Sequence, residues 1–227
     1  ISQYKKSIQY SRLNHYWLMK IMIKAYQEYQ KQRVRAEQKQ RKLDDLTILK
    51  AFLGESRKTI DALPDKFIVE TLNDISKFLT KETYEFKNIF KHKGVTYGFI
   101  PNLDAITYGE NTDLLNYISD WSTMHKAIAV MYRPIKKNWL GRYSKTSYDI
   151  DKYNGTSHAD VFLDLDAEIV MGAMVFFYNL TNALVNSIPN YLERVVTNQE
   201  KTSSLKSGES MQSYINSLKE ISQSMKL

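Results

Sequence analysis

The chain has 227 residues, 43% of them hydrophobic and 25% charged, so it can bury a sizeable core and is not predicted to be disordered. It contains no cysteine, which excludes disulfides, thiolate metal sites and a cysteine nucleophile. Its net charge of +7 is uneven, because residues 1–60 carry 14 Lys and Arg against 5 Asp and Glu, while the rest of the chain is slightly acidic. A polyanionic partner, if there is one, should therefore bind the N-terminal segment.

Residues 1–54 are predicted to form a long basic helical arm. No Gly or Pro occurs before Gly54, and the composition favours one long helix or two nearly continuous ones. The segment 17–23, WLMKIMI, is apolar on nearly every side and should be enclosed by other chains or by the body. The segment 30–42 is polar all round, so it should cross solvent or lie against something charged. The candidate protein-interface residues of this arm are Trp17, Leu18 and Met22.

The basic side chains of the arm are candidate contacts to nucleic acid. Each Lys or Arg could neutralise a phosphate, which would give a salt-dependent affinity, and Tyr26 and Tyr29 could stack on bases. The alternative is a solvated helix surface or a face for an acidic protein. The charges wrap around the helix instead of forming one stripe, and this favours the alternative. The residues concerned are Lys24, Lys31, Arg33, Arg35, Lys39, Arg41 and Lys42.

Residues 55–196 are predicted to form a mostly helical body with a small β element. Pro64 and Asp65 suit the first turn of a helix. The stretch YEFKNIFKHKGVTYGFI predicts a β-hairpin that turns at residues 92–94, and helical spacing returns over 113–131. The fold class is therefore expected to be mainly α. The predicted buried face of the first body helix is Phe67, Ile68, Thr71, Leu72, Ile75, Phe78 and Leu79.

The stretch MHKAIAVMYRPI, which begins at Met124, predicts a core helix that ends at a proline. The residue before a proline is pushed out of the α region, so Arg133 should end the helix. We expect the Tyr132 hydroxyl to reach a carbonyl, Arg133 to pair with an acid downstream, and Trp139 to fold back over the core. The corner is interpreted as structural, not catalytic.

Residues 169–192 carry no charged side chain, so they fit either a membrane span or a core helix. Asn179, Asn182 and Asn186 line one stripe of this helix, and a span facing lipid would have to hide all three amides. We therefore predict a core helix and no membrane partner.

The C-terminal residues change character twice. Residues 197–210 are rich in Ser, Lys and Thr and predict a flexible linker. Residues 211–227 predict an amphipathic helix that docks on a groove or a neighbouring subunit. Its candidate protein-interface residues are Met211, Ile215, Leu218, Ile221 and Met225.

Groups that could hold a metal ion are few and scattered. The four histidines form no H-x-x-x-H or H-E-x-x-H pair, so a zinc site is not predicted. The stretch DIDKYNG, residues 149–155, partly fits a calcium loop, but a tyrosine occupies position 5 and the glycine comes one place late. A turn is therefore expected there, with no metal and no cofactor.

Catalytic groups are equally sparse. Asp160, Asp164 and Asp166 could form a carboxylate cluster for acid–base chemistry, but acids near a helix start more simply complement the helix dipole. The sequence has no G-x-S-x-G and no Gly-rich phosphate loop. We predict no catalytic residue and no small-molecule substrate. An enzyme with a loop-assembled site is a third, weaker alternative, its candidate lining being His125, Asp149 and Asp151.

Four stretches carry a resemblance to a known class of proteins. In order, YGFIPNLDAITYGENTDLLNY, MHKAIAVMYRPI, YNGTSHADVFLDL and MVFFYNLTNAL resemble tail-assembly-chaperone-like structural proteins of tailed bacteriophages, including crAss-like podoviruses. The resemblance covers residues 84–190 and assigns no functional residue. It implies a non-catalytic virion or assembly protein in the tail or portal-vertex region, present in multiple copies with other virion proteins. Such a protein would lie in the virion, near packaged DNA, or in the host cytoplasm during assembly.

Overall fold

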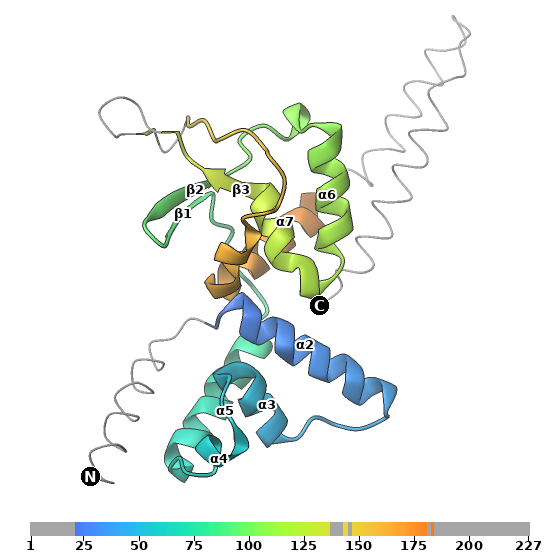
Figure 1. Cartoon of the computed structure of the whole chain (residues 1–227), viewed down its shortest axis with the longest axis vertical. Helices are drawn as coiled ribbons and strands as arrows, with labels where there is room; N and C mark the ends of the chain where they lie inside the picture. Colours follow the sequence, from blue (N-terminus) through green and yellow to red (C-terminus); the bar gives the residue numbers. More distant parts are fainter. Residues whose placement is uncertain (1–20, 137–142, 145–146, 181–182, 184–227) are drawn as a thin grey trace, which may run out of the picture. The chain divides into compact units, whose positions relative to one another are not determined.

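The computed structural model describes residues 21–136, 143–144, 147–180 and 183 (Figure 1). The described chain is mainly α-helical with one three-stranded antiparallel sheet, which confirms the predicted fold class. It divides into two compact units. Unit 1 contains the described residues up to Thr80 together with Asp164–Glu168, and unit 2 contains Lys81–Leu163 and the described residues from Ile169 onward. The division thus follows Thr80, whereas the sequence placed a boundary at residue 54.

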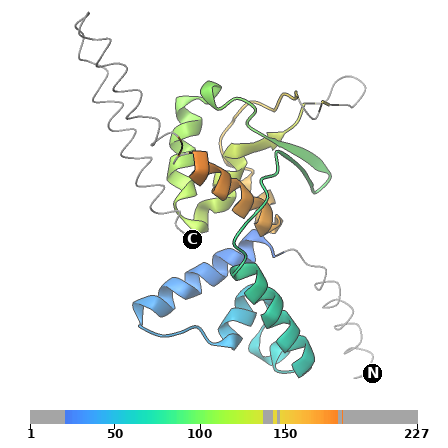
Figure 2. The same ribbon diagram turned by 180° about the vertical axis from the view of Figure 1, so that it is seen from behind.

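Unit 1 is a group of helices that share one apolar core. Figures 1 and 2 show the three later helices gathered beside the first. The Tyr26 ring meets the edge of the Phe78 ring at 5.7 Å between centroids, and the Tyr29 ring lies 5.2 Å from that of Phe52. The first contact joins the predicted arm to the first body helix, and the second joins two helices of the arm. The helices are α2 (Ile23–Gln38), α3 (Asp45–Leu53), α4 (Arg57–Ile60) and α5 (Asp65–Leu79).

The helix predicted for the arm is interrupted at residue 39, so the expectation of nearly continuous helices was wrong. Gln40 has a positive φ of 51°. Its N–H donates to Glu37 O at 2.9 Å and the Arg41 N–H donates to Ala36 O at 2.9 Å, the hydrogen bonds of a Schellman motif. Glycine normally takes the left-handed position of this motif, so the absence of Gly and Pro concealed the helix end. The next helix, α3, ends at Gly54 as predicted, with a φ of 67°.

Unit 2 is built on a sheet of order β1-β2-β3 with both neighbouring pairs antiparallel. The predicted hairpin is confirmed, and its turn lies at Lys93 and Gly94, which have φ of 46° and 82°. Helices α6 and α7 lie side by side (Figure 1). A further helix spans residues 167–180, and all of it from Ile169 onward belongs to unit 2. The elements are β1 (Ile89–His92), β2 (Val95–Phe99), η1 (Leu103–Ala105), α6 (Tyr108–Ile118), η2 (Trp121–Thr123), α7 (Met124–Met131), β3 (Tyr132–Pro134) and η3 (Ala159–Asp164).

The proline corner connects the core helix α7 to β3. Every residue of α7 except Lys126 is buried. The Tyr132 side chain is fully buried and its hydroxyl donates to Lys87 O at 2.8 Å, as predicted. Arg133 pairs with Glu110, an acid upstream, so the expected downstream partner was wrong. The reason is that Arg133 continues in β3, beside Gly98 of β2, instead of starting a loop.

The predicted core helix at residue 169 is confirmed as far as residue 180. Val170, Ala173 and Met174 are buried, and the Phe176 ring stacks on that of Phe86 at 4.2 Å between centroids. A Cβ on Gly172 would lie 2.2 Å from Glu85 O, so this helix touches the segment before β1 backbone to backbone. Within the described residues, no helix is long and apolar enough to cross a membrane. Trp139, the linker 197–210 and the docking helix 211–227 lie outside the described residues.

Candidate functional site

The N-terminus of α6 carries a capping box. Thr107 Oγ1 accepts a hydrogen bond from the Glu110 N–H at 3.2 Å, and Glu110 Oε2 accepts one from the Thr107 N–H at 2.7 Å. The motif T-x-x-E before an apolar run is the sequence signature of this arrangement. The sequence reasoning did not use that signature, and so it started the helix about five residues late.

The same carboxylate forms the buried ion pair of unit 2. Arg133 Nη1 donates to Glu110 Oε1 at 2.5 Å, and the two side chains are 10% and 5% exposed. Burial favours the neutral form of Glu110, but the hydrogen bonds from Thr107 and the charge of Arg133 outweigh it and hold the pKa below its usual value. Both carboxylate oxygens are therefore engaged, and the group braces α6 against β3.

Tyr153 covers this ion pair. Its ring centroid lies 6.0 Å from Arg133 Cζ, within the range of a cation–π contact, and its hydroxyl donates to Asp113 Oδ2 on α6. Burial, followed by the hydrogen bond to Asp113, raises the pKa of Tyr153 well above its ordinary value. The hydroxyl therefore stays protonated and keeps donating. Sequence reasoning missed this contact because residues 113 and 153 are brought together only by the tertiary fold.

His125, Asp149 and Asp151, the residues of the enzyme alternative, have separate surroundings. His125 Nε2 lies 3.7 Å from Asp160 Oδ1, and burial lowers the pKa of His125 although Asp160 partly offsets this. The side chains of Asp149 and Asp151 are exposed, while their backbones pair with the residues after Arg133. The residues 149–155 form a turn segment, in which Gly155 has a φ of 89°.

The three acids at 160, 164 and 166 are divided among three roles. Asp160 faces His125, and Asp164 pairs with Lys24 at 2.7 Å in unit 1. Asp166 Oδ1 accepts from the Glu168 N–H at 3.0 Å at the start of helix 167–180. This last contact agrees with the simpler interpretation, in which an acid complements a helix start. Within the described residues, no group of three or more His, Asp or Glu could hold a metal ion.

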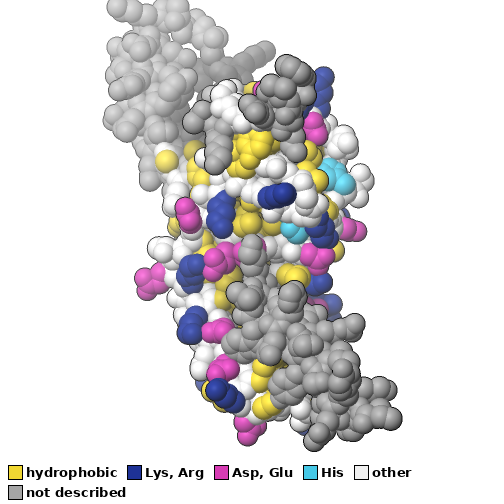
Figure 3. Space-filling model, turned by 90° about the vertical axis from the view of Figure 1, so that its left-hand side faces the viewer, with side chains coloured by type: hydrophobic (Ala, Val, Ile, Leu, Met, Phe, Trp, Pro, Cys, Tyr) yellow, Lys and Arg dark blue, Asp and Glu magenta, His cyan; other side chains and the backbone are white. Residues whose placement is uncertain are grey.

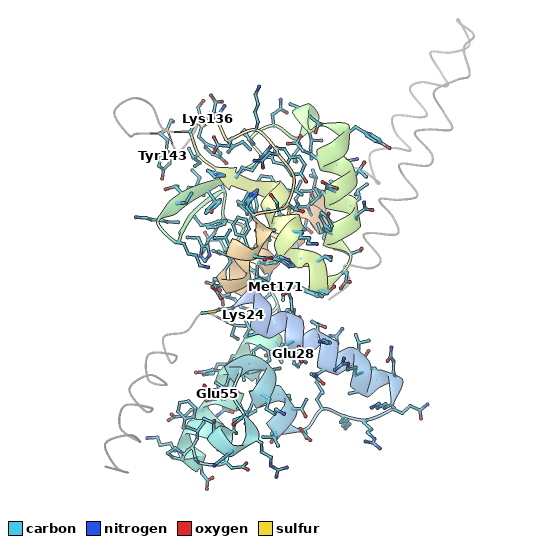
Figure 4. The ribbon with its side chains drawn as sticks, viewed as in Figure 1. Lys24, Glu28, Glu55, Lys136, Tyr143 and Met171 are labelled. Atoms are coloured by element: carbon cyan, nitrogen blue, oxygen red, sulfur yellow. The ribbon has the colours of Figure 1, made fainter. Side chains whose placement is uncertain are left out.

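The candidate phosphate contacts are all exposed, and three of them pair with acids on the same unit. Lys24 pairs with Asp164, Lys31 with Glu28 at 3.7 Å and Arg33 with Glu37 at 3.4 Å. Lys24 and Glu28 lie one turn apart on α2 (Figure 4). Acidic and basic side chains are also interspersed on the described face in Figure 3. These pairs reduce the charge that α2 can offer to a phosphate backbone.

The other four candidate phosphate contacts lie near the C-terminal end of α2. Within the part of the chain that the structure describes, they are exposed and form no ion pair. The Schellman turn at Gln40 brings the chain around at this point, so the side chains on either side of it belong to one helix end. We call this set the α2 basic end; it consists of Arg35, Lys39, Arg41 and Lys42.

Of the predicted protein-interface residues, only Met22 is described. It is partly exposed and forms a β-bridge with Asp166 in unit 1. The others lie outside the described residues; they are Trp17, Leu18, Met211, Ile215, Leu218, Ile221 and Met225.

Comparison of the chain with protein-family models, curated proteins and solved structures found no match.

Proposed function

We propose that this protein is a non-catalytic structural or assembly component of a tailed-phage virion, in the tail or portal-vertex region. It would act through contacts with other virion proteins in multiple copies, in the virion or in the host cytoplasm during assembly. The four stretches that resemble such proteins support the proposal, and the segment they span, residues 84–190, includes most of the described part of unit 2.

The observation that carries the proposal is how the polar side chains in this region are used. One oxygen of Glu110 caps α6 and the other holds β3 against it. The hydroxyls of Tyr132 and Tyr148 donate to backbone carbonyls, and that of Tyr153 donates to Asp113. Side chains that could act on a substrate are here engaged in holding the fold together, and this supports a role through contacts over a catalytic one.

Sedimentation velocity of the full chain tests the proposal. We expect a discrete multimer that dissociates when Leu218 and Ile221 are both replaced by Ser, because the docking helix would lose its apolar contacts. Thermal unfolding of the described units should not change. Replacing Ser217 and Gln223 with Ala on the same segment is the matched control. A chain that stays monomeric at every concentration, and that mass spectrometry finds neither in purified particles nor in their precursors, contradicts the proposal.

The second candidate function is nucleic-acid binding, which the α2 basic end favours. Its four exposed cations have no ion pair in the described structure, unlike those earlier on α2. A labelled duplex added to the sedimentation experiment separates the two functions. DNA binding that is lost in Arg35→Glu/Arg41→Glu but kept in Lys24→Glu/Lys31→Glu, a matched charge change, would assign the contact to this end. Each phosphate neutralised should add about 0.9 to the salt slope.

A further inference from the structure

Residues 147–155, here called the strap, lie along the outer edge of β3. Ile150 forms an antiparallel bridge with Ile135, just after β3. The Lys136 N–H donates to Asp149 O and the Asp151 N–H donates to Pro134 O, both at 2.9 Å. Lys136 lies in the segment that leaves β3, and Tyr143 in the segment that leads to the strap (Figure 4). The strap therefore covers the outer edge of β3, which is the edge opposite β2.

Two tyrosines anchor the strap on either side of this bridge. The first, Tyr148, occupies the space that a side chain at Gly98 would need, since a Cβ there would lie 2.4 Å from Tyr148 Cε2. Its hydroxyl donates to Phe99 O at 2.9 Å. The second, Tyr153, lies over Arg133 and donates to Asp113. The strap thus seals the buried ion pair, in which Arg133 Nε has no hydrogen-bond partner.

The strap has little burial of its own. No residue from 147 to 155 is fully buried, whereas Arg133 and Glu110 beneath it are both buried. Segments with few buried apolar contacts open at a lower free energy than the core they cover. The anchors are two side chains, one bridge and a few hydrogen bonds, which join the strap to β2, to α6 and to the end of β3.

We propose that the strap is a latch that opens as a local unit while the sheet, α6 and α7 stay folded. Opening removes Tyr153 from the Arg133 guanidinium, exposes the Glu110–Arg133 ion pair to solvent and leaves the outer edge of β3 unpaired. Gly98 controls the stability of the closed strap, because the Tyr148 ring occupies the space that a side chain at position 98 would fill. This inference does not depend on the proposed function.

Limited trypsin digestion of the full chain tests the latch, since Lys152 is an exposed cleavage site inside it. In Gly98→Ala, the new methyl would lie 2.4 Å from Tyr148 Cε2 and 2.9 Å from Ile135 Cγ1, so an anchor of the strap and its bridge partner must both shift. We expect cleavage after Lys152, followed by mass spectrometry, to become about tenfold faster, as the loss of one or two anchoring contacts would produce. Gly109→Ala is the matched control, because a Cβ there meets nothing within 4 Å.

Hydrogen exchange on the same samples separates local from global opening. Amides of α7 should keep their protection while those of the strap lose it. Equal cleavage rates in Gly98→Ala and Gly109→Ala, or α7 exchange that rises in parallel with strap cleavage, would overturn the proposal.

Tyr153→Phe provides a second variant that adds no atom, in case Gly98→Ala does not fold. It keeps the ring over Arg133, removes the bond to Asp113, and should speed the cleavage about threefold.

Discussion

At the scale of single residues, the Glu110 carboxylate of unit 2 has two structural roles. One oxygen accepts from the backbone of Thr107 and the other from the guanidinium of Arg133, so one carboxylate both caps α6 and holds β3. A buried ion pair of this kind adds little net stability, since desolvation offsets the attraction, but removing one partner leaves an uncompensated charge. Its contribution is therefore to fix which elements lie together.

Glu110→Gln should lower the free energy of unfolding by about 3 kcal/mol, because Arg133 keeps its charge in a buried site without a counter-ion. Glutamine has one acceptor oxygen, so when it keeps the bond from Thr107 the cap is retained and the charge and the hydrogen bond of Arg133 are removed together. Urea unfolding gives the measurement. Glu82→Gln, an equal charge change at an exposed site of the same unit, should have almost no effect. A similar loss in both variants would show that net charge is responsible.

At the scale of elements, the sequence predicted those whose signals are local. The apolar spacing of α5, the hairpin turn at Lys93 and Gly94, and the burial of α7 were all readable. The end of α2 was not, because Gln40 adopts a conformation that sequence rules assign to glycine. The third strand was also missed, since three residues that include a proline carry no periodicity and pair only because β2 is there.

The helix 167–180 offers a test of packing between elements. Gly172→Ala should lower the free energy of unfolding by about 2 kcal/mol, because the methyl would overlap a backbone carbonyl of the segment before β1, which cannot swing aside as a side chain can. Thermal unfolding of this variant is compared with that of Gly109→Ala, in which the same change gains helix propensity in open space. Equal midpoints for the two would show that the close approach is not maintained in solution.

At the scale of the whole molecule, the predicted arm and body do not match the observed units. The aromatic contacts of Tyr26 and Tyr29 tie α2 to α3 and α5, so the described part of the basic segment belongs to a folded unit and is not an extended arm. Composition located the positive charge correctly but could not show that acids 4 or 140 positions away would pair with it. The candidate site in unit 2 likewise depends on pairs 23 and 40 residues apart, which no spacing rule connects.

Acid should destabilise unit 2 in two steps. Burial lowers the pKa of His125 below its ordinary value of 6.5. Between pH 6.5 and the folded pKa, His125 is therefore protonated in the unfolded chain but not in the folded chain. Stability then falls, by up to about 1.4 kcal/mol per pH unit, until the folded pKa is reached. The lowered pKa of Glu110 gives stability that is present above 4.5 and lost as the pH falls through its folded value. Urea unfolding from pH 7.5 to 3.5 measures both, and His125→Gln should remove only the first step.

The two crowded glycines limit how this chain can change over evolutionary time. Gly98 and Gly172 each stand where any side chain would overlap a neighbour, while Gly109 stands in open space. Divergent descendants should therefore keep the first two glycines, together with the Thr107, Glu110 and Arg133 set, long after their surfaces have lost detectable similarity. Such a sparse pattern of fixed positions and fixed intervals could identify distant kin that overall sequence identity would miss.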